Sequence, residues 1–270
     1  MLRDITLGQY YPVDSVIHRL DPRVKLLATL IYLISLFVMN SFTGYLIAAL
    51  VLAVLVKLSR VPFRFMTRGL KSIIIVLLIS VSFNLFLTPG TELVRFGFLR
   101  ITREGLRIAL MMGVRLILLV LGSSLMTLTT TPNQLTDGLE KGLGILKRVG
   151  VPVHEIAMMM SIALRFIPIL VEETDKIMKA QQARGADFES GNIIQRAKAM
   201  VPILVPLFIS AFRRANDLAM AMEARCYRGG EGRTKMKPLH YERRDRIAYI
   251  VIALYLVICV ILRMVPGVPV

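Results

Sequence analysis

The sequence LRIALMMGVRLILLVLGSSLMTL, residues Leu106–Leu128, is long and apolar enough to cross a bilayer as one helix. A membrane-spanning helix needs about 20 mostly apolar residues, and the charge in the middle of this stretch is Arg115. Working outward from it, four further stretches have the same character. They are Leu26–Met39, Gly44–Leu58, Leu70–Leu87 and Ile247–Met264. The sequence therefore predicts an all-α membrane protein with about five transmembrane helices.

The length of the first two stretches and the charge of Arg115 each have two possible interpretations. The first two are short, and they could form a helical hairpin that does not fully span. The uncharged loop of residues 40–43 between them favours a tight turn at the outer surface instead. Arg115 lies where a charge is costly, so it either pairs structurally with protein groups or takes part in transport.

The composition agrees with a membrane protein and disfavours other classes. Of the 270 residues, 55% are hydrophobic, and Lys and Arg outnumber Asp and Glu by 34 to 18. A nucleic-acid-binding protein would be basic too, but it would not carry several long apolar runs, so we expect membrane lipids and no nucleic acid as partners. Cys226 and Cys259 form no CxxC or Cys/His cluster and are interpreted as reduced.

The loops indicate the orientation. The loop between the second and third predicted spans is purely basic, with Lys57, Arg60, Arg64, Arg68 and Lys71. By the positive-inside rule this loop and the basic N-terminal segment are cytoplasmic. Alternating residues 93–100 predict a short outer hairpin. The resulting organisation is an N-terminal segment with four spans (1–131), a cytoplasmic region (132–246) and a last span (247–270).

The cytoplasmic region is expected to contain one short and two long helices. The short helix covers Asn133–Arg148, and the long, amphipathic helices cover Val153–Phe188 and Ile193–Tyr227. A helix of about 35 residues is ~50 Å long. Each long helix contains proline, which should kink it.

Each long helix has an apolar first half and a charged second half. The apolar halves include Met158, Met159, Met160 and Ile162 in one helix, and Pro202 and Pro206 in the other. Methionine-rich surfaces adapt to varied partners, so these six residues are candidates for docking another membrane protein. The alternative is that they pack only within this chain.

Both long helices end in a similar tripeptide, in which an arginine stands between two small residues. The first ends in Ala183-Arg184-Gly185 and the second in Ala224-Arg225-Cys226. Aligning these tripeptides also aligns Ala180 with Ala221, which indicates a weak duplication. A solvated helix end is the simplest interpretation of either tripeptide alone.

Motifs for catalysis or metal binding are missing from the sequence. It contains no GxxxxGK[ST], GxSxG or HExxH, and its three histidines lie far apart and near no Cys or carboxylate cluster with ligand spacing. We therefore expect a non-catalytic chain with no metal site and no cofactor of its own.

The paired tripeptides, the topology and one further signature carry a resemblance to a known family. The second signature is Gly8-Gln9-Tyr10-Tyr11-Pro12, Ser15, His18-Arg19-Leu20-Asp21-Pro22-Arg23 and Lys25. With these, nearly the whole chain resembles the transmembrane T component of energy-coupling factor (ECF) transporters, the vitamin and metal importers of the ABC class. The same segment also has a local interpretation, because Asp21 can cap the first helix and Pro22 suits its first position.

The resemblance implies a scaffold in a prokaryotic cell membrane. In that family two coupling helices cross on the cytoplasmic side, and their Ala-Arg-Gly ends insert into two ATPase subunits, which bind ATP and Mg. It implies that Ala183, Arg184, Gly185, Ala224, Arg225 and Cys226 contact the ATPases. The apolar surface of the helices would hold a substrate-binding membrane protein, the S component, and ATP hydrolysis would move it during vitamin or micronutrient uptake.

One residue departs from the family's pattern. Cys226 stands where the family often has Gly, and Cys tolerates a left-handed helix end poorly. We therefore expect Gly229 to supply the termination of the second long helix. Two other functions stay open: the membrane subunit of a dedicated cobalt or nickel importer, and a membrane interaction protein without a transport role.

Overall fold

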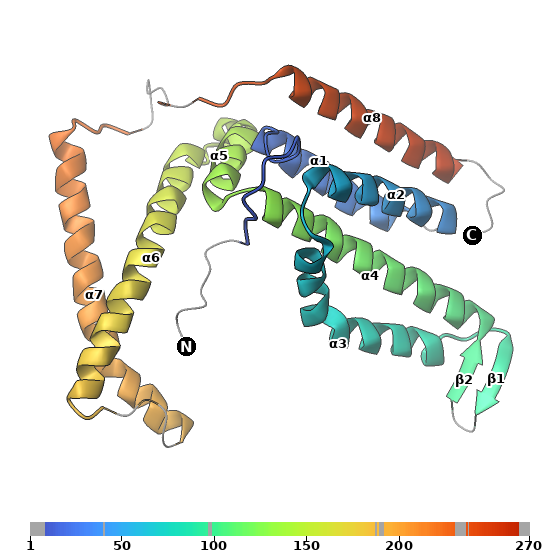
Figure 1. Cartoon of the computed structure of the whole chain (residues 1–270), viewed down its shortest axis with the longest axis horizontal. Helices are drawn as coiled ribbons and strands as arrows, with labels where there is room; N and C mark the ends of the chain where they lie inside the picture. Colours follow the sequence, from blue (N-terminus) through green and yellow to red (C-terminus); the bar gives the residue numbers. More distant parts are fainter. Residues whose placement is uncertain are drawn as a thin grey trace. The chain divides into compact units, whose positions relative to one another are not determined.

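In the computed structural model the chain forms eight α-helices, a short 3-10 helix and a two-stranded sheet within residues 9–39, 41–96, 99–186, 188, 192–229, 236 and 238–264, which the structure describes. The elements fall into two compact units (Figure 1). The bundle unit consists of Gly8–Lys141 and Leu239–Val270, and the helix-pair unit of Met1–Leu7 and Gly142–Pro238.

The bundle unit contains most of the helices. They are α1 (Pro22–Val38), α2 (Phe42–Ser59), α3 (Phe63–Leu87), α4 (Arg103–Thr129), α5 (Pro132–Gly142) and α8 (Arg243–Met264). Antiparallel strands β1 (Glu92–Phe96) and β2 (Leu99–Thr102) connect α3 to α4, which confirms the predicted hairpin. The helix-pair unit contains the 3-10 helix η2 (Leu143–Val149) and the long helices α6 (Val153–Ala183) and α7 (Ile193–Ala224).

Helix starts follow from short polar side chains that cap them. The Asp21 carboxylate accepts a 2.9 Å hydrogen bond from the N–H of Arg23, and Pro22 is the first residue of α1, as predicted. The Ser41 hydroxyl accepts a hydrogen bond from the N–H of Gly44 at the start of α2, and the Thr102 hydroxyl accepts one from the N–H of Gly105 at the start of α4. These caps position the first residues of α1, α2 and α4.

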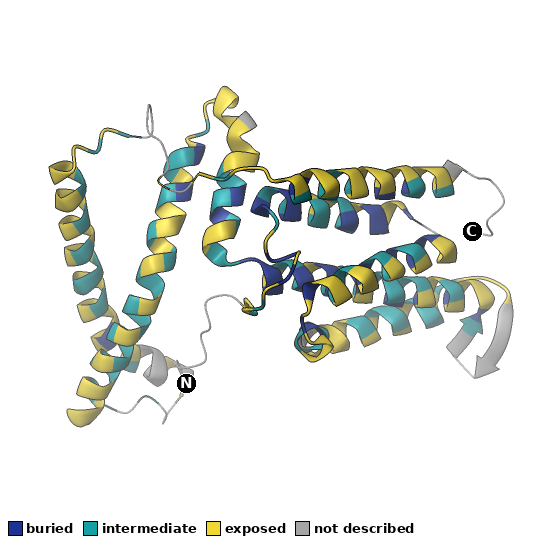
Figure 2. Cartoon of the chain, turned by 45° about the horizontal axis from the view of Figure 1, so that its top comes forward, coloured by how far each residue is buried: buried dark blue, intermediate teal, exposed yellow. Residues whose placement is uncertain are grey.

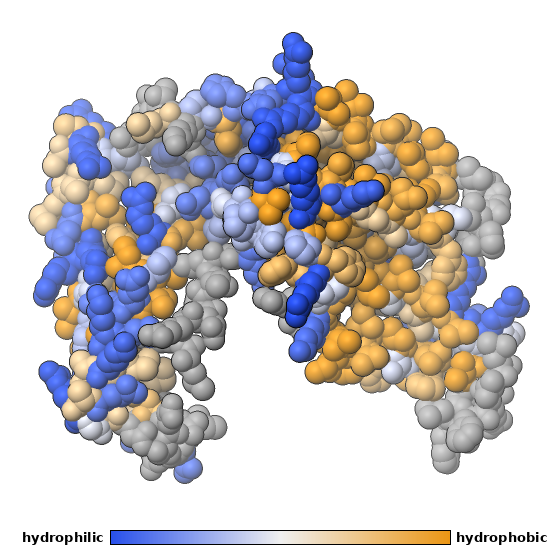
Figure 3. Space-filling model, in the orientation of Figure 1, coloured by the Kyte–Doolittle hydropathy of each residue, from blue (hydrophilic) through white to orange (hydrophobic). Residues whose placement is uncertain are grey.

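The bundle core lies between α1, α2 and α4, with α8 against α1. Leu36, Ala48 and Met66 are completely buried in it. Gly122 of α4 lets Tyr32 of α1 approach closely, because a Cβ at this position would lie 2.6 Å from the tyrosine ring. Figure 2 shows the buried residues gathered on the facing sides of these helices, and Figure 3 shows apolar residues over their outer surfaces. An apolar exterior of this kind is suited to lipid.

Arg115 joins α4 to the turn between α1 and α2. Its Nε donates a 2.7 Å hydrogen bond to the Tyr45 hydroxyl, and its Nη2 lies 3.4 Å from the Met39 carbonyl oxygen at the end of α1. The guanidinium also lies 5.7 Å from the ring centres of Phe37 and Tyr45. These contacts are those of a structural pairing, which was one of the two alternatives for this residue.

Four described helices are long and apolar enough to cross a membrane, or five if the bent α3 is one span. The four are α2, α4, α6 and α8. The all-α membrane fold is therefore confirmed, but the membership differs from the prediction. Helix α1, with 17 residues, is shorter than these spans, whereas α6, assigned to the cytoplasmic region from the sequence, has the length and composition of one.

Several predicted helix bounds are wrong. The short helix is split, because α5 gives way to η2 at Leu143, next to Gly142 and Gly144. Helix α6 ends at Ala183 rather than Phe188, and α7 ends at Ala224 rather than Tyr227. Helix α8 begins at Arg243, before the predicted Ile247, since its first turn is polar and contains Asp245.

Helices α6 and α7 pack as an antiparallel pair. The Arg214 Nη2 of α7 lies 3.0 Å from a Glu173 carboxylate oxygen of α6, and the Gln181 side-chain amide donates to the Pro202 carbonyl at 3.4 Å. In Figure 1 the first turns of α7, in light orange, run at an angle to the rest of the helix. Pro202 and Pro206 lie inside α7, and proline removes the hydrogen bonds that keep a helix straight.

Candidate functional site

The end of α6 is a glycine-terminated turn with an exposed arginine. Gly185 has a φ of 88°, and its N–H donates to the Gln182 carbonyl at 2.9 Å. The N–H of Ala186 donates to the Gln181 carbonyl at 3.0 Å. These two bonds form a Schellman motif, which satisfies the last carbonyls of the helix and reverses the chain. Arg184 stands at the turn with its side chain exposed.

The end of α7 repeats this turn with cysteine in place of glycine. Cys226 has a φ of 54°, and its N–H donates to the Glu223 carbonyl at 2.8 Å. The N–H of Tyr227 donates to the Met222 carbonyl at 3.0 Å. The expectation that Gly229 ends this helix is therefore wrong, because two hydrogen bonds hold Cys226 itself in the left-handed conformation.

The six tip residues are exposed and lie at two separate places. Ala183, Arg184, Gly185, Ala224, Arg225 and Cys226 all have accessible surfaces. The structure does not bring the two tripeptides together, because α6 and α7 run antiparallel and each tip lies at a different end of the pair (Figure 1). Gln181, near the first tip, contacts Pro202, and α7 rises by ~33 Å from Pro202 to Ala224.

The backbone conformation of the tips gives a testable difference between them. A left-handed L-residue costs about 1–2 kcal/mol that glycine avoids. We expect Cys226→Gly to slow hydrogen exchange of the Tyr227 amide, and Gly185→Ala to accelerate exchange of the Ala186 amide. No atom lies within 4 Å of a Cβ added at Gly185, so this substitution tests backbone strain alone. Changes in the same direction at both tips would contradict the assignment.

The six predicted docking residues are divided between distant parts of the helix pair. Met159 is 58% and Met160 41% exposed, and both prolines are exposed, whereas Met158 and Ile162 are half-buried. The Met158–Met160 cluster lies near the start of α6. Pro202 contacts Gln181 near the other end of α6, ~33 Å further along the helix. The six residues therefore do not form one continuous patch.

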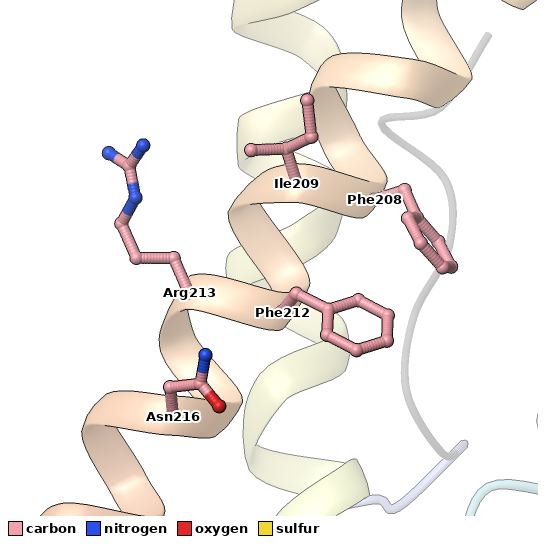
Figure 4. A pocket seen from close by; sticks show the side chains of 5 residues that line it. All are labelled: Phe208, Ile209, Phe212, Arg213 and Asn216. Atoms are coloured by element: carbon pink, nitrogen blue, oxygen red, sulfur yellow. The ribbon is translucent and has the colours of Figure 1, made fainter.

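The apolar first half of α7, which was expected from the sequence, presents a larger exposed face than the six docking candidates indicated. Its exposed members are Val201, Leu204, Val205, Phe208, Ile209 and Phe212. The Phe208 and Phe212 rings, with centres 4.7 Å apart, line a shallow open hollow with Ile209, Arg213 and Asn216 (Figure 4). The recurrence of apolar residues at three- and four-residue intervals from Val201 to Phe212 could have revealed this face.

A buried lysine holds the end of α4 to the N-terminal segment. Lys25 Nζ donates to the Thr129 carbonyl at 2.8 Å and to the His18 carbonyl at 3.0 Å, and the residue is 6% exposed. The Lys25 ammonium group is therefore a fixed donor between the segment that contains His18 and the end of α4.

A buried carboxylate next to it ties the start of α8 to the start of α1. Asp245 is 2% exposed, and its carboxylate accepts from the N–H of Asp21 at 2.9 Å and from the N–H of Glu242 at 2.8 Å. The Arg23 guanidinium donates to the Leu239 carbonyl at 3.1 Å and lies 4.5 Å from the Tyr241 ring centre. We call Asp21, Arg23, Lys25 and Asp245 the clamp.

The clamp lies near the residue at which the chain re-enters the bundle unit. The chain leaves the bundle unit after Lys141 and re-enters it at Leu239, next to the clamp. Asp245 therefore fixes the returning end, while Lys25 fixes the end of α4, which leads into α5. The pair Asp21 and Asp245 is 224 residues apart in sequence, so no local pattern predicted it.

His18 orders the segment that precedes α1. Its Nε2 donates to the Tyr11 carbonyl at 3.0 Å, because a carbonyl oxygen can only accept, and its Nδ1 lies 2.7 Å from the Ser15 hydroxyl. Burial lowers the pKa of the His18 imidazole below its ordinary value, which favours the neutral ring. The Tyr11 N–H in turn donates to the Leu128 carbonyl at the end of α4.

Comparisons with known proteins agree with this arrangement. The model of the cobalt transport protein family (CbiQ) matches residues 14–236. The energy-coupling factor transporter transmembrane protein EcfT of Clostridium kluyveri is 58% identical over 250 residues, which are 92% of this chain and 93% of the relative. The proteins of the same name from Ruminiclostridium cellulolyticum and Bacillus subtilis are 55% identical over 245 residues and 48% identical over 246 residues. They cover 91% of this chain in each case, and 92% and 93% of those relatives. This chain therefore belongs to the CbiQ/EcfT family of energy-coupling factor transporter transmembrane proteins.

Proposed function

We propose that this chain is the scaffold of an ECF-type importer, which couples ATP hydrolysis by two ATPase subunits to movement of a substrate-binding S component. The observation that carries the proposal is the repeated tip. Two exposed arginines, Arg184 and Arg225, stand on identical Schellman turns at opposite ends of one antiparallel helix pair. Two equivalent contacts far apart suit two similar ATPase subunits, each with its own ATP and Mg.

The tips have the chemistry that a groove-binding contact needs. An arginine guanidinium offers five donors in a rigid plane and stays charged, so it can bind partner carboxylates or carbonyls. The small neighbours Ala183, Gly185 and Ala224 would let each turn enter a narrow groove. In this proposal the N-terminus and the helix pair face the cytoplasm, where ATP is available.

The exposed apolar faces of α6 and α7 would hold the S component. In this proposal Met159 and Met160 contribute from α6, and Phe208 and Phe212 from α7. An apolar surface surrounded by charge is unfavourable in water and is covered by lipid or by another membrane protein. The clamp would keep the returning end of the chain fixed to the bundle while the tips move with the ATPases.

The proposal is tested by purification of tagged wild-type protein and the Arg184→Ala/Arg225→Ala variant from solubilised membranes. Bound proteins are identified by mass, and ATP hydrolysis is measured. Wild type should bring down ATPase subunits and small membrane proteins, and the variant should lose the ATPases. Absence of ATPases from the wild-type sample would favour a membrane interaction protein without a transport role.

The substrate class has two candidates. Relatives of 48–58% identity are named energy-coupling factor transporter transmembrane proteins, and we propose vitamins or other micronutrients on the resemblance to that class. The family description, cobalt transport protein, supports a dedicated cobalt or nickel importer. Several different co-purifying S components would favour the first candidate, and one dedicated partner the second.

A charge at Met159 should weaken association with the S component and with the ATPases to different extents. We expect Met159→Lys to weaken S-component association more than ATPase association, because Met159 is 58% exposed near the start of α6, ~36 Å along the helix from the first tip. Met159→Leu, which keeps an apolar side chain, is the matched control and should bind both partners. Greater loss of the ATPases than of the S component from Met159→Lys would place the docking surface elsewhere.

A further inference from the structure

The corner between α2 and α3 carries exposed cations without carboxylates beside them. Lys57, Arg60, Arg64 and Lys71, here called the basic corner, all have exposed side chains. None of the four forms an ion pair with any residue that the structure describes. The sequence has no Asp or Glu between Asp21 and Glu92, so no acid close in the chain offsets this charge.

The first segment of α3 presents its cations on one face. Arg64 and Lys71 are seven residues apart, which places them on the same side of a helix. Met66, two residues after Arg64, lies on the opposite side and is completely buried in the bundle core. The packing of Met66 therefore fixes the direction in which the cations point, away from the protein.

The direction of this segment suits a membrane surface. Phe63–Lys71 is inclined by 61° to Ile73–Leu87, the apolar part of α3. When Ile73–Leu87 lies along the bilayer normal, the first segment runs closer to the plane of the surface than to the normal. Leu58 and Phe63 at the same corner are 49% and 58% exposed. Apolar residues beside cations are typical of helices at the boundary between headgroups and acyl chains.

The start of α3 adds to the positive potential. Its N-cap residue is Pro62, whose side chain makes no capping hydrogen bond, and its first turn contains no acidic residue. The N-terminus of a helix carries a partial positive charge that attracts anions. This potential acts in the same place as the side chains of Arg60 and Arg64.

We propose that the basic corner binds the phosphate headgroups of anionic phospholipids at the bilayer surface. Guanidinium groups match phosphate oxygens in geometry and charge, and the exposed Leu58 and Phe63 side chains suit the acyl region beside them. The lipid would hold the α2–α3 corner at a fixed depth. This inference stands apart from the proposed function, because it involves neither the tips nor the apolar faces of the helix pair.

The test uses the detergent-solubilised full chain, titrated with phosphatidylglycerol and, separately, with phosphatidylcholine of the same acyl chains. Bound lipid is counted by native mass spectrometry. Each cation near a surface contributes about fivefold to binding of anionic lipid, so Arg60→Gln/Arg64→Gln/Lys71→Gln should weaken phosphatidylglycerol binding at least tenfold. Phosphatidylcholine binding should stay unchanged.

The matched control removes three exposed cations elsewhere. Lys147→Gln/Arg148→Gln/Lys179→Gln lowers the charge equally and should bind phosphatidylglycerol within about threefold of wild type. Equal weakening in both variants would overturn the proposal in favour of diffuse charge attraction. Competition by millimolar inorganic phosphate would overturn it in favour of a site for free anions.

A measurement on the wild-type protein tests the proposal even when the triple variant does not fold. Hydrogen exchange of residues 60–64 is compared between nanodiscs of phosphatidylglycerol and of phosphatidylcholine. The proposal predicts slower exchange at this corner in phosphatidylglycerol. Equal exchange in the two lipids would contradict it.

Discussion

Reversal of both tip charges, in Arg184→Glu/Arg225→Glu, should abolish association with ATPase subunits and leave membrane insertion intact. Removing a charged group from a buried contact costs roughly 2–5 kcal/mol of binding free energy, and a reversal adds repulsion. Each tip would then bind at least about 30-fold more weakly. Co-purification of the ATPases, measured against the amount of inserted protein, gives the result.

The matched control reverses one exposed arginine on each of the same helices away from the tips. Arg165→Glu/Arg213→Glu makes the same change in net charge, and both side chains are exposed. This variant should retain the ATPases. Equal retention by the tip variant would defeat the assignment of Arg184 and Arg225 as the contacts.

Loss of the clamp lysine should strongly destabilise the bundle unit. Lys25→Met keeps a side chain of similar length but leaves the Thr129 and His18 carbonyls without their donor. It also removes the cation near the buried Asp21 and Asp245 carboxylates. Breaking a buried charged network costs about 3–5 kcal/mol, so thermal unfolding in detergent should begin roughly 10 °C lower.

A neighbouring cation provides the control for this prediction. Arg19 lies 3.5 Å from Asp14, and the two side chains are 58% and 86% exposed. An exposed pair contributes little, so Arg19→Met should change the free energy of unfolding by less than about 1 kcal/mol. Similar unfolding temperatures for Lys25→Met and wild type would mean that the buried ammonium group contributes no net stability.

The sequence predicted those parts of the fold that depend on local pattern. Hydropathy indicated the apolar helices, and the Asp21-Pro22 pair indicated the start of α1, because capping depends on neighbouring residues. The tip arginines were found from a repeated tripeptide. Their shared Schellman geometry required the structure, since a cysteine at the second tip argued for a later end to the helix.

Other features depend on tertiary contacts and were missed. The role of Asp245 comes from its contact with the Asp21 amide, 224 residues away in the chain. The 61° bend in α3 could not be predicted from a proline, because Phe63–Leu87 contains none. Helix α6 has the length and composition of a span even though its second half is charged, so hydropathy alone does not decide whether it crosses the membrane.

The measurement that tests the central claim most directly is the rate at which a maleimide modifies Cys226, with and without the ATPase subunits. Cys226 is exposed and Cys259 is buried, so the native chain has a thiol at the second tip that can be labelled selectively. Ala183→Cys in a Cys226→Ser background reports on the first tip. If each tip enters an ATPase groove, both thiols should react at least about tenfold more slowly in the complex. Unchanged reaction rates at both tips, with the ATPases bound, would contradict the account.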